Sequence, residues 1–561
     1  MKKKMLSLLL AAAMLATMVT GCGFTGGGDS KSTDKSTDAD SGSEAPAQEI
    51  TISMASDPQI YDPRSMVGLD MRQVGAQMYL SLLRKDQNGE LQPGNAENWE
   101  VNEDNTVYTF NLNKEVKWSD GEPVKAQDYV YAWTSALEPE YASETADAFY
   151  EIKNAKKYNT GEAAKEDVGI KAVDDYTLEV TMENSDLLFL ESVSNVKMAP
   201  VRQDIVEKYD DPQEWSFTPE TLVVNGPFIM TENEPKQYIV LEKNPEYYKA
   251  DEIKLDRIKF VFVEEATTAL ASFKTDAVDI CTTIPEAEIQ NMIEDGTAIV
   301  SPMIATYYYS FNMSDMVEDE AVREAFSKVE VRKALSLAID RESITNEVVK
   351  GGQTPSKGFV AEGIVMPDGS DWTDESNYID PKADLEEAKK LLADAGYPDG
   401  EGFPTFQLFY NTSETHQAIA QAVQDMWKQG LGINVELVNK ETKVFADERQ
   451  YGHFQMTRSG NENNSTIVPE MLGLFVTDSI DITNEPRYSN PDYDALIQKA
   501  TSAPDLETRM EFYRQAEDLL MKDMPVIPIY NYTNVAAVKP NVKGFYQGTD
   551  GGVVFDWMYK E

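Results

Sequence analysis

The sequence is poor in the residues that most enzyme and metal sites need. Its 561 residues include only two cysteines and two histidines. Two cysteines cannot build a disulfide framework, and two histidines exclude a histidine-rich zinc site. A phosphate-binding loop, a nucleophile elbow, and the Cys-x-x-Cys and His-Glu-x-x-His patterns are all missing. A serine or a carboxylate pair could still act, but 97 acidic residues make any pair uninformative. We therefore expect no enzyme chemistry, no metal and no cofactor.

Basic residues are also few: 50 Lys and Arg against 97 Asp and Glu give a formal net charge of −47. Nucleic acid is excluded as a partner, because phosphate binding needs clustered Lys and Arg. Bulk anionic substrates are disfavoured too, unless a local basic site overrides the field. The hydrophobic content of 41% fits a globular protein, and the length allows about two to four domains.

Long hydrophobic runs are confined to the N-terminus. Residues 1–4 are basic and residues 6–19 are apolar but too short for a stable membrane anchor, which is typical of a secretory signal. The run ends in VTGC at Cys22, which resembles a bacterial lipobox and implies diacylglycerol on the Cys22 sulfur. A plain secretory signal is the alternative. We predict a lipoprotein signal peptide over 1–21 and a disordered Gly/Ser/Thr/Asp-rich tether over 22–48. The protein would then be lipid-anchored on the extracytoplasmic face of the bacterial cell membrane.

Strand and helix patterns alternate after the tether, which predicts an α/β class. An apolar strand, a helix and a second strand run from residue 258 to Cys281, whose thiol is expected to be buried and inert. A helical pattern runs through Val74, Met78 and Leu82. No linker interrupts residues 49–561, so any domains are interleaved.

One stretch, residues 448–471, concentrates positive charge in this acidic chain: Arg449, His453 and Arg458 lie within ten residues. Residues 453–458 alternate as a strand that ends at Arg458 and leads into a polar loop. A cation at such a strand end either faces solvent or is presented to a ligand. Composition alone favours the solvated arginine.

Several motifs, in order along the chain, resemble the family-5 extracellular solute-binding proteins, which are the oligopeptide- and dipeptide-binding proteins of ABC importers. They are KWSDGEPVKAQDYVYAW, NGPF, LEKNPEYY, ALASFKTDAVDI, TYYYSFN, VRKALSLAIDRESI, AKKLLADAGYPDG and YSNPDYDALIQKA. The resemblance covers essentially all of residues 49–561. It implies a bilobed periplasmic-binding-protein-like fold of type II, in its large three-domain form, with hinge closure on the ligand.

The same resemblance implies a domain division. Lobe I would comprise residues 49–79, 205–308 and 528–561, with domain II at 80–204 inserted and lobe III at 309–527. The implied function is a monomeric receptor that captures oligopeptides between the two lobes. It would deliver them to an ABC permease and its ATPase subunits.

The resemblance also implies a set of ligand-binding residues. The set contains two backbone-pairing segments, cleft tyrosines, two cleft arginines and a histidine: Val67, Gly68, Leu69, Ser459, Gly460, Asn461, Tyr141, Tyr530, Tyr532, Arg449, Arg458 and His416. Peptide backbone would pair with the two segments without dictating side chains. Arg458 matches the partner of a short peptide's carboxylate, and His416 matches the partner of a longer one.

The sequence departs from the family pattern where the ligand's α-amine should bind. The family has a Trp and an Asp where this chain has Asn461 and Asn464. An ammonium without a charged partner there would cost several kcal/mol, so either Glu462 substitutes or the ligand has no free amine. Lys125 also replaces the usual Thr before a helix, which predicts a lost side-chain cap.

Three other functions stay open. The fold could bind a different solute, such as a glycan, a nickel chelate or a modified peptide. It could also serve surface signalling or adhesion without transport, and a secreted hydrolase is a remote third possibility.

Overall fold

The computed structural model describes residues 48–561 apart from residues 88, 187, 461–467 and 481–482. Residues Ala47–Glu561 form one unit. The predicted signal peptide and Cys22 lie outside the described residues, as do Asn461, Glu462 and Asn464. Within the described ranges, no helix has both the length and the hydropathy needed to cross a membrane.

Segments rich in β-branched and aromatic residues build an eleven-stranded sheet. Its spatial order is β15 (Val435–Lys440), β14 (Phe406–Asn411), β16 (Met456–Gly460), β12 (Ala298–Phe311), β17 (Val526–Val538), β11 (Ile280–Cys281), β1 (Glu49–Met54), β10 (Arg257–Phe262), β9 (Tyr238–Lys243) and β8 (Phe228–Glu234), with β13 (Thr354–Pro355) paired to β17. Strand β1 pairs in parallel with both β10 and β11, which α6 (Ala266–Lys274) connects. This is the predicted strand–helix–strand unit, and Cys281 is buried in it with a free thiol.

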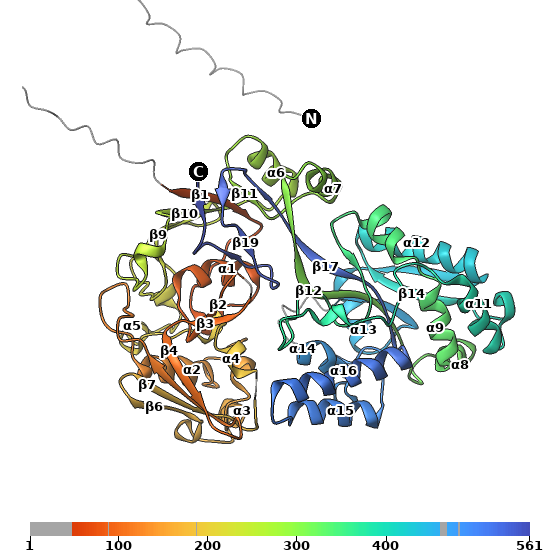
Figure 1. The fold of residues 1–561 in the computed structure, drawn as a ribbon, viewed down its shortest axis with the longest axis horizontal. Helices are drawn as coiled ribbons and strands as arrows, with labels where there is room; N and C mark the ends of the chain where they lie inside the picture. The colour runs from red at the N-terminus through yellow and green to blue at the C-terminus, as the bar shows by residue number, and fades with distance from the viewer. Residues whose placement is uncertain (1–47, 88, 187, 461–467, 481–482) are drawn as a thin grey trace, which may run out of the picture. The chain divides into compact units, whose positions relative to one another are not determined.

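Strands β12 and β17 are the longest in the sheet and lie antiparallel, side by side (Figure 1). Their pairing runs from Ala298 opposite Ala537 to Ser310 opposite Val526, with two register shifts. At one end Ala298 and Ala537 join a small core under α6, and at the other Phe311 joins a different core. The predicted domain boundaries at 308/309 and 527/528 therefore fall inside these two strands.

A second sheet of four strands has the order β4 (Ala96–Val101), β5 (Val107–Leu112), β7 (Thr177–Thr181) and β6 (Ile170–Asp174). Alternate residues of β5 and β7 are buried, as expected for a half-buried antiparallel sheet. Three further pairs each contain two strands: β2 (Leu83–Lys85) with β3 (Leu91–Pro93), β18 (Val542–Lys543) with β21 (Tyr559–Lys560), and β19 (Tyr546–Gln547) with β20 (Val553–Val554).

The helices of the described chain include α1 (Leu69–Met78), α2 (Ala126–Ala136), α3 (Ala155–Asn159), α4 (Phe189–Ser192), α5 (Gln203–Val206), α7 (Glu286–Glu294), α8 (Glu320–Ser327), α9 (Val329–Leu337), α10 (Arg341–Ser343), α11 (Leu385–Asp394), α12 (Glu414–Leu431), α13 (Thr442–Gln450), α14 (Val468–Leu472), α15 (Pro491–Thr501) and α16 (Leu506–Asp523). Helix α12 begins where the Ser413 hydroxyl accepts from the backbone N–H of His416, 3.3 Å away. This cap fixes the first turn, which carries His416. At the other end, Gly432 adopts the left-handed conformation that terminates the helix.

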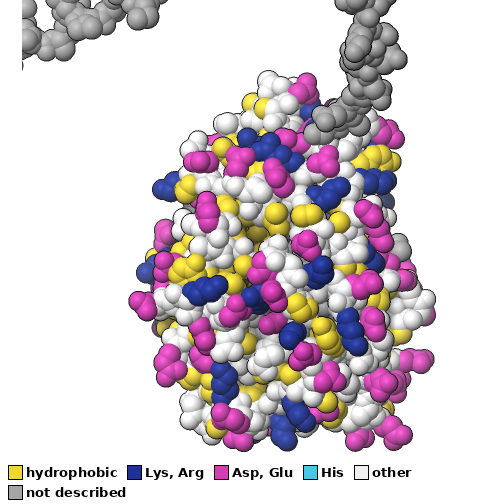
Figure 2. Space-filling view, turned by 90° about the vertical axis from the view of Figure 1, so that its left-hand side faces the viewer, with side chains coloured by type: hydrophobic (Ala, Val, Ile, Leu, Met, Phe, Trp, Pro, Cys, Tyr) yellow, Lys and Arg dark blue, Asp and Glu magenta, His cyan; other side chains and the backbone are white. Residues whose placement is uncertain are grey.

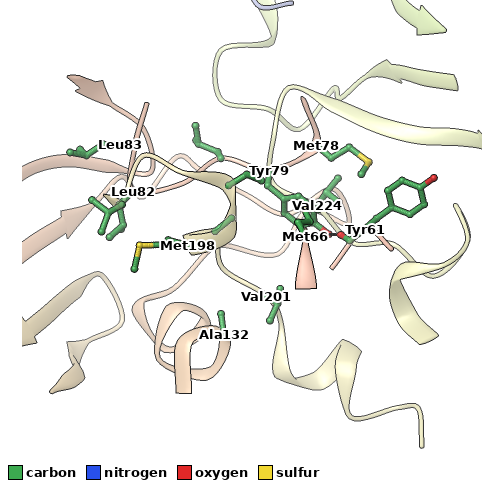
Figure 3. Packing of buried hydrophobic residues seen from close by; sticks show 14 of the residues in the cluster. Tyr61, Met66, Met78, Tyr79, Leu82, Leu83, Ala132, Met198, Val201 and Val224 are labelled. Carbon is green, nitrogen blue, oxygen red and sulfur yellow. Dashed lines mark hydrogen bonds between the residues drawn. The ribbon is translucent and has the colours of Figure 1, made fainter. Parts of the chain in front are cut away.

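Hydrophobic residues from distant segments bury the faces of both sheets. The largest cluster joins β1, α1, α2 and β5 and includes the buried Trp118 and Trp133. Figure 3 shows part of it, in which Met66, Tyr79 and Val224 lie close together. A separate cluster surrounds the ends of β12 and β17 with α9, α11 and α12.

Two local predictions need correction. Helix α1 ends at Met78 instead of continuing through Leu82, because the Asn225 side chain pairs with both the N–H and the carbonyl of Leu80, at 3.0 and 2.9 Å. Strand β16 starts at Met456 and not at His453, since α13 and the turn at Gly452 occupy the preceding residues.

The prediction for the start of α2 is confirmed. Lys125 makes no side-chain cap, as predicted, but its backbone N–H donates to the Asp128 carboxylate at 2.9 Å. Burial raises the pKa of Asp128 to about 6, although the N–H of Lys125 and the Trp118 indole oppose this shift. The Asp128 carboxylate of the first turn thus partly caps the start of the helix.

The surface shows how the acidic excess is distributed. On the face in Figure 2, acidic and basic side chains are interspersed. Of the two histidines, His453 is exposed at the end of α13 and His416 is half-buried in α12. Charge of one sign therefore does not dominate this face, despite the net charge of the chain.

Candidate functional site

Three neighbouring strands and one helix place aromatic rings and a guanidinium together. Tyr307 of β12 stands opposite Tyr530 of β17, and their rings stack with centroids 4.8 Å apart. The Tyr532 ring lies 5.2 Å from that of Tyr530, and the His416 imidazole lies 5.6 Å from Tyr307. Arg458 of β16 completes this group. We call these five residues the aromatic cluster.

Arg458 is oriented by two tyrosines of the cluster. Its guanidinium carbon lies 5.3 Å from the centre of the Tyr307 ring, a cation–π distance. Its Nη2 donates to the hydroxyl of Tyr532 at 3.4 Å. The side chain is half-buried, so its charge acts in a medium that screens less than water. Such a guanidinium is suited to bind a carboxylate.

His416 is held neutral beside this arginine. Burial, together with the charge of Arg458, lowers the pKa of His416 to about 4. Its Nδ1 is buried and has no hydrogen-bond partner within the described ranges. Because the folded-state pKa lies below the ordinary 6.5, this group makes the fold less stable as pH falls from about 6.5 towards 4.

The edge of β16 next to Arg458 is only partly paired. Strand β14 pairs with β16 at Met456 and Thr457, whereas β12 pairs with β16 as far as Gly460. Arg458, Ser459 and Gly460 therefore have no strand partner on the β14 side among the described strands. An unpaired strand edge offers N–H and carbonyl groups to an added strand.

The other predicted arginine lies on the opposite face of β16. Arg458 and Ser459 are consecutive strand residues, so their side chains leave the strand on opposite faces. Arg449 of α13 donates from Nη1 to the Ser459 hydroxyl at 3.3 Å. Its Nε lies 3.2 Å from Oε1 of Glu485, with which it forms an ion pair. The structure thus groups Arg449 with Glu485 and Arg458 with the aromatic cluster.

The remaining described candidates lie elsewhere. Val67 and Leu69 are 42% and 39% exposed, and Gly68 between them has a φ of 85°, which only glycine adopts readily. The Tyr141 hydroxyl is bonded to Ser65 Oγ at 2.7 Å and to an Asp62 carboxylate oxygen at 3.1 Å. Val67, Gly68 and Leu69 are accessible, whereas the Tyr141 hydroxyl is already engaged by the protein.

Two residues of this region were missed by reasoning from the sequence. Tyr307 stands in the TYYYSFN motif, whose strand residues are all buried, so no alternation of buried and exposed positions marks it. Glu485 is one of 97 acidic residues and carries no signal in the sequence. No group of three or more metal-ligating side chains occurs in the part of the chain that the structure describes.

Comparison with known proteins places these features in a family. Residues 90–481 match the family described as bacterial extracellular solute-binding proteins, family 5, middle. The periplasmic oligopeptide-binding protein OppA of Salmonella typhimurium is 33% identical over 516 residues, which cover 90% of this chain and 91% of OppA. A protein of Escherichia coli named probable deoxycholate-binding periplasmic protein YgiS is 31% identical over 505 residues, with 89% and 91% coverage.

Solved structures agree with the sequence comparison. The unliganded open form of MppA, a periplasmic murein tripeptide binding protein, matches with a TM-score of 0.80 and 31% identity, over 92% of this chain and 98% of MppA. The chain therefore has the predicted α/β, bilobed binding-protein fold. It is a solute-binding protein and not an enzyme. By sequence and by structure alike, the chain belongs to the family-5 bacterial extracellular solute-binding proteins.

Proposed function

We propose that this protein is an extracytoplasmic receptor that captures oligopeptides between two lobes and delivers them to an ABC permease and its ATPase subunits. The observation that carries the proposal is the position of Arg458 and neutral His416 at the unpaired end of β16. A peptide extended along this edge would pair through its backbone, and its C-terminal carboxylate would meet the guanidinium. The names of the relatives OppA and MppA support the same ligand class.

The rest of the assembly follows from this proposal. Val67, Gly68 and Leu69 supply a second backbone segment. Tyr141 and Tyr532 line the cleft, and Tyr530, only 2% exposed, packs against Tyr532. Domain closure about a hinge encloses the peptide. The division into lobe I, domain II and lobe III keeps the boundaries given above. Lipid on Cys22 holds a monomeric receptor at the outer face of the membrane.

A second candidate ligand class is favoured by one feature of the sequence. Asn464 stands where the family carries the Asp that binds an α-amine, and Asn461 replaces the family's Trp. An amine-blocked peptide or a non-peptide solute would not need that charge. The relative named for deoxycholate shows that the family's names extend beyond peptides.

Mass spectrometry of solutes that co-purify from the native host separates these candidates. The expected result is a set of linear peptides of mixed sequence, because pairing through the backbone leaves side chains unspecified. The protein is then unfolded, dialysed, refolded and titrated calorimetrically with synthetic peptides of different lengths. Recovery of one non-peptide solute, together with no response to any peptide, would contradict the proposal.

The pH dependence of binding is a second test of the site. The His416 pKa is about 4 in the structure described, and a ligand carboxylate beside it would raise that pKa. If the bound value rises by about two units, affinity increases about tenfold between pH 7 and pH 5, with uptake of a proton. The peptide carboxylate remains mostly ionised over this range.

Calorimetry in buffers of different ionisation enthalpy measures the proton uptake directly. His416→Gln should remove the pH dependence, whereas the matched variant His453→Gln should keep it. The role of His416 is wrong if both variants titrate like the wild-type protein, or if a C-terminally amidated peptide shows the same proton uptake.

A further inference from the structure

Glu485 is an acidic residue built into the face of β16 opposite the aromatic cluster. Its Oε1 lies 3.2 Å from Arg449 Nε and accepts from the Ser459 hydroxyl at 2.9 Å. Its Oε2 is buried and accepts no hydrogen bond from the described residues. The side chain is only 14% exposed. This is not a solvated surface carboxylate.

The segment that carries Glu485 is held rigidly on both sides. The neighbouring Asn484 is fully buried, and its Nδ2 donates to the carbonyls of Phe475, Val476 and Tyr488 at 2.8 to 3.0 Å. Two residues further on, Arg487 Nη2 donates to the carbonyl of Gln450, at the end of α13. The position of the carboxylate is therefore fixed relative to the helix that carries Arg449.

Burial and the neighbouring groups have opposite effects on the pKa of Glu485. Burial raises the pKa of Glu485, whereas the charge of Arg449, the Ser459 hydroxyl and the charge of Arg458 lower it. A carboxylate and a guanidinium in contact form a neutral pair, so a ligand anion that approaches Arg449 also meets Glu485 at similar distance. Attraction and repulsion then largely cancel. Arg458, in contrast, lies on the other face, among the rings of Tyr307 and Tyr532.

We propose that Glu485 determines charge specificity. By pairing with Arg449 it prevents that arginine from anchoring an acidic ligand group, so the site selects ligands whose group next to Arg449 is neutral or cationic. This inference rests on the proposed function, because it concerns the same ligand site. It reassigns Arg449 from a ligand anchor to half of an internal pair. Arg458 remains the anchor for a single ligand carboxylate.

The test compares two sets of peptides that differ only in one side chain, Ala or Asp, placed in turn at each position. In the wild-type protein the Asp peptides are expected to bind more weakly than their Ala counterparts at the position nearest Arg449, whose side chain is 29% exposed. In Glu485→Gln, which keeps an acceptor for Ser459, the Asp-to-Ala affinity ratio at that position should rise at least about tenfold, since the repulsion that offset the charge of Arg449 is removed. Arg449→Met in the same background should abolish the rise.

A matched control separates the local effect from net charge. Glu448 adjoins Arg449 in the chain but pairs with Lys440 at 3.0 Å, so Glu448→Gln removes the same charge and should leave the affinity ratio unchanged. Glu485→Asp keeps the charge and should retain the preference of the wild-type protein. Denaturant unfolding of the Glu485→Gln and Arg449→Met single and double variants measures the coupling of the pair without any ligand.

The outcomes are distinguishable. Peptide binding with an unchanged Asp-to-Ala ratio in Glu485→Gln overturns the inference alone, and so does additive unfolding of the two single variants. A tenfold loss of affinity for Ala peptides in Arg449→Met also overturns it, because Arg449 would then anchor the ligand. If no variant binds any peptide, the proposed function fails and the inference fails with it, even where the unfolding coupling is intact.

Discussion

Replacing Arg458 by methionine is expected to weaken the binding of a peptide with a free C-terminal carboxylate by about two to three orders of magnitude. Truncating one partner of an enclosed, hydrogen-bonded charge pair costs about 2 to 5 kcal/mol. Methionine keeps an apolar stem against Tyr307, whose ring lies 5.3 Å from the guanidinium carbon. The loss would therefore report the charge and its hydrogen bonds, more than the packing. Isothermal titration at pH 7.5, where His416 is neutral, gives the measurement.

Two comparisons decide whether the loss concerns the carboxylate. A C-terminally amidated peptide should bind the wild-type protein weakly and lose little more in Arg458→Met. Arg449→Met should cost less than about tenfold, because Glu485 already occupies that guanidinium at 3.2 Å. Equal affinity of amidated and free peptides for the wild-type protein would show that Arg458 does not bind a ligand carboxylate.

Local sequence patterns predicted the elements whose energetics are local. The strand–helix–strand unit that ends at the buried Cys281 occurs as expected. The errors at Leu82 and His453 have a common cause. In both places tertiary contacts, from Asn225 and from the turn at Gly452, take backbone groups that a single-sequence pattern assigns to a regular element.

The order of strands in the large sheet could not be predicted from sequence patterns, for a related reason. Strands β12 and β17 are separated by more than two hundred residues, and nothing in their composition specifies that they pair along nearly their whole lengths. Pairing of this kind depends on packing at both ends, where Ala298 and Phe311 enter different cores. The resemblance supplied the bilobed fold, and residue patterns alone gave only the α/β class.

The basic residues of the candidate site could be predicted from the sequence, but the groups that they contact could not. The resemblance pointed to Arg458, Arg449 and His416, and the structure adds which groups each contacts. Glu485 could not be found, because it comes from a segment 26 residues beyond Ser459 and acts only through their contact. Ion pairs between distant segments have no fixed spacing in the sequence, whereas helix caps and amphipathic faces do.

Glu517, a buried carboxylate in α16, is linked through hydrogen bonds to the strand that carries Tyr307. Glu517 is fully buried, and its Oε1 accepts from the backbone N–H groups of Phe359 and Val360, each at 2.9 Å. Its Oε2 accepts from the Trp372 indole at 2.7 Å. The carbonyl of Phe359 in turn accepts from the Thr306 hydroxyl on β12, next to Tyr307.

Glu517→Ala is expected to destabilise the protein by about 3 to 5 kcal/mol, because three buried donors lose their acceptor at once. Glu517→Gln should cost less: its carbonyl oxygen can still accept from both backbone N–H groups, while its amide would face the donor of Trp372. Urea unfolding monitored by tryptophan fluorescence measures both changes.

Glu511→Ala, at an exposed position of the same helix, is the matched control and should change stability by less than about 0.5 kcal/mol. Equal stability of Glu517→Ala and Glu511→Ala would contradict the role of Glu517. A loss of stability with unaltered peptide affinity would show that the chain from Glu517 through Thr306 supports the fold without shaping the site.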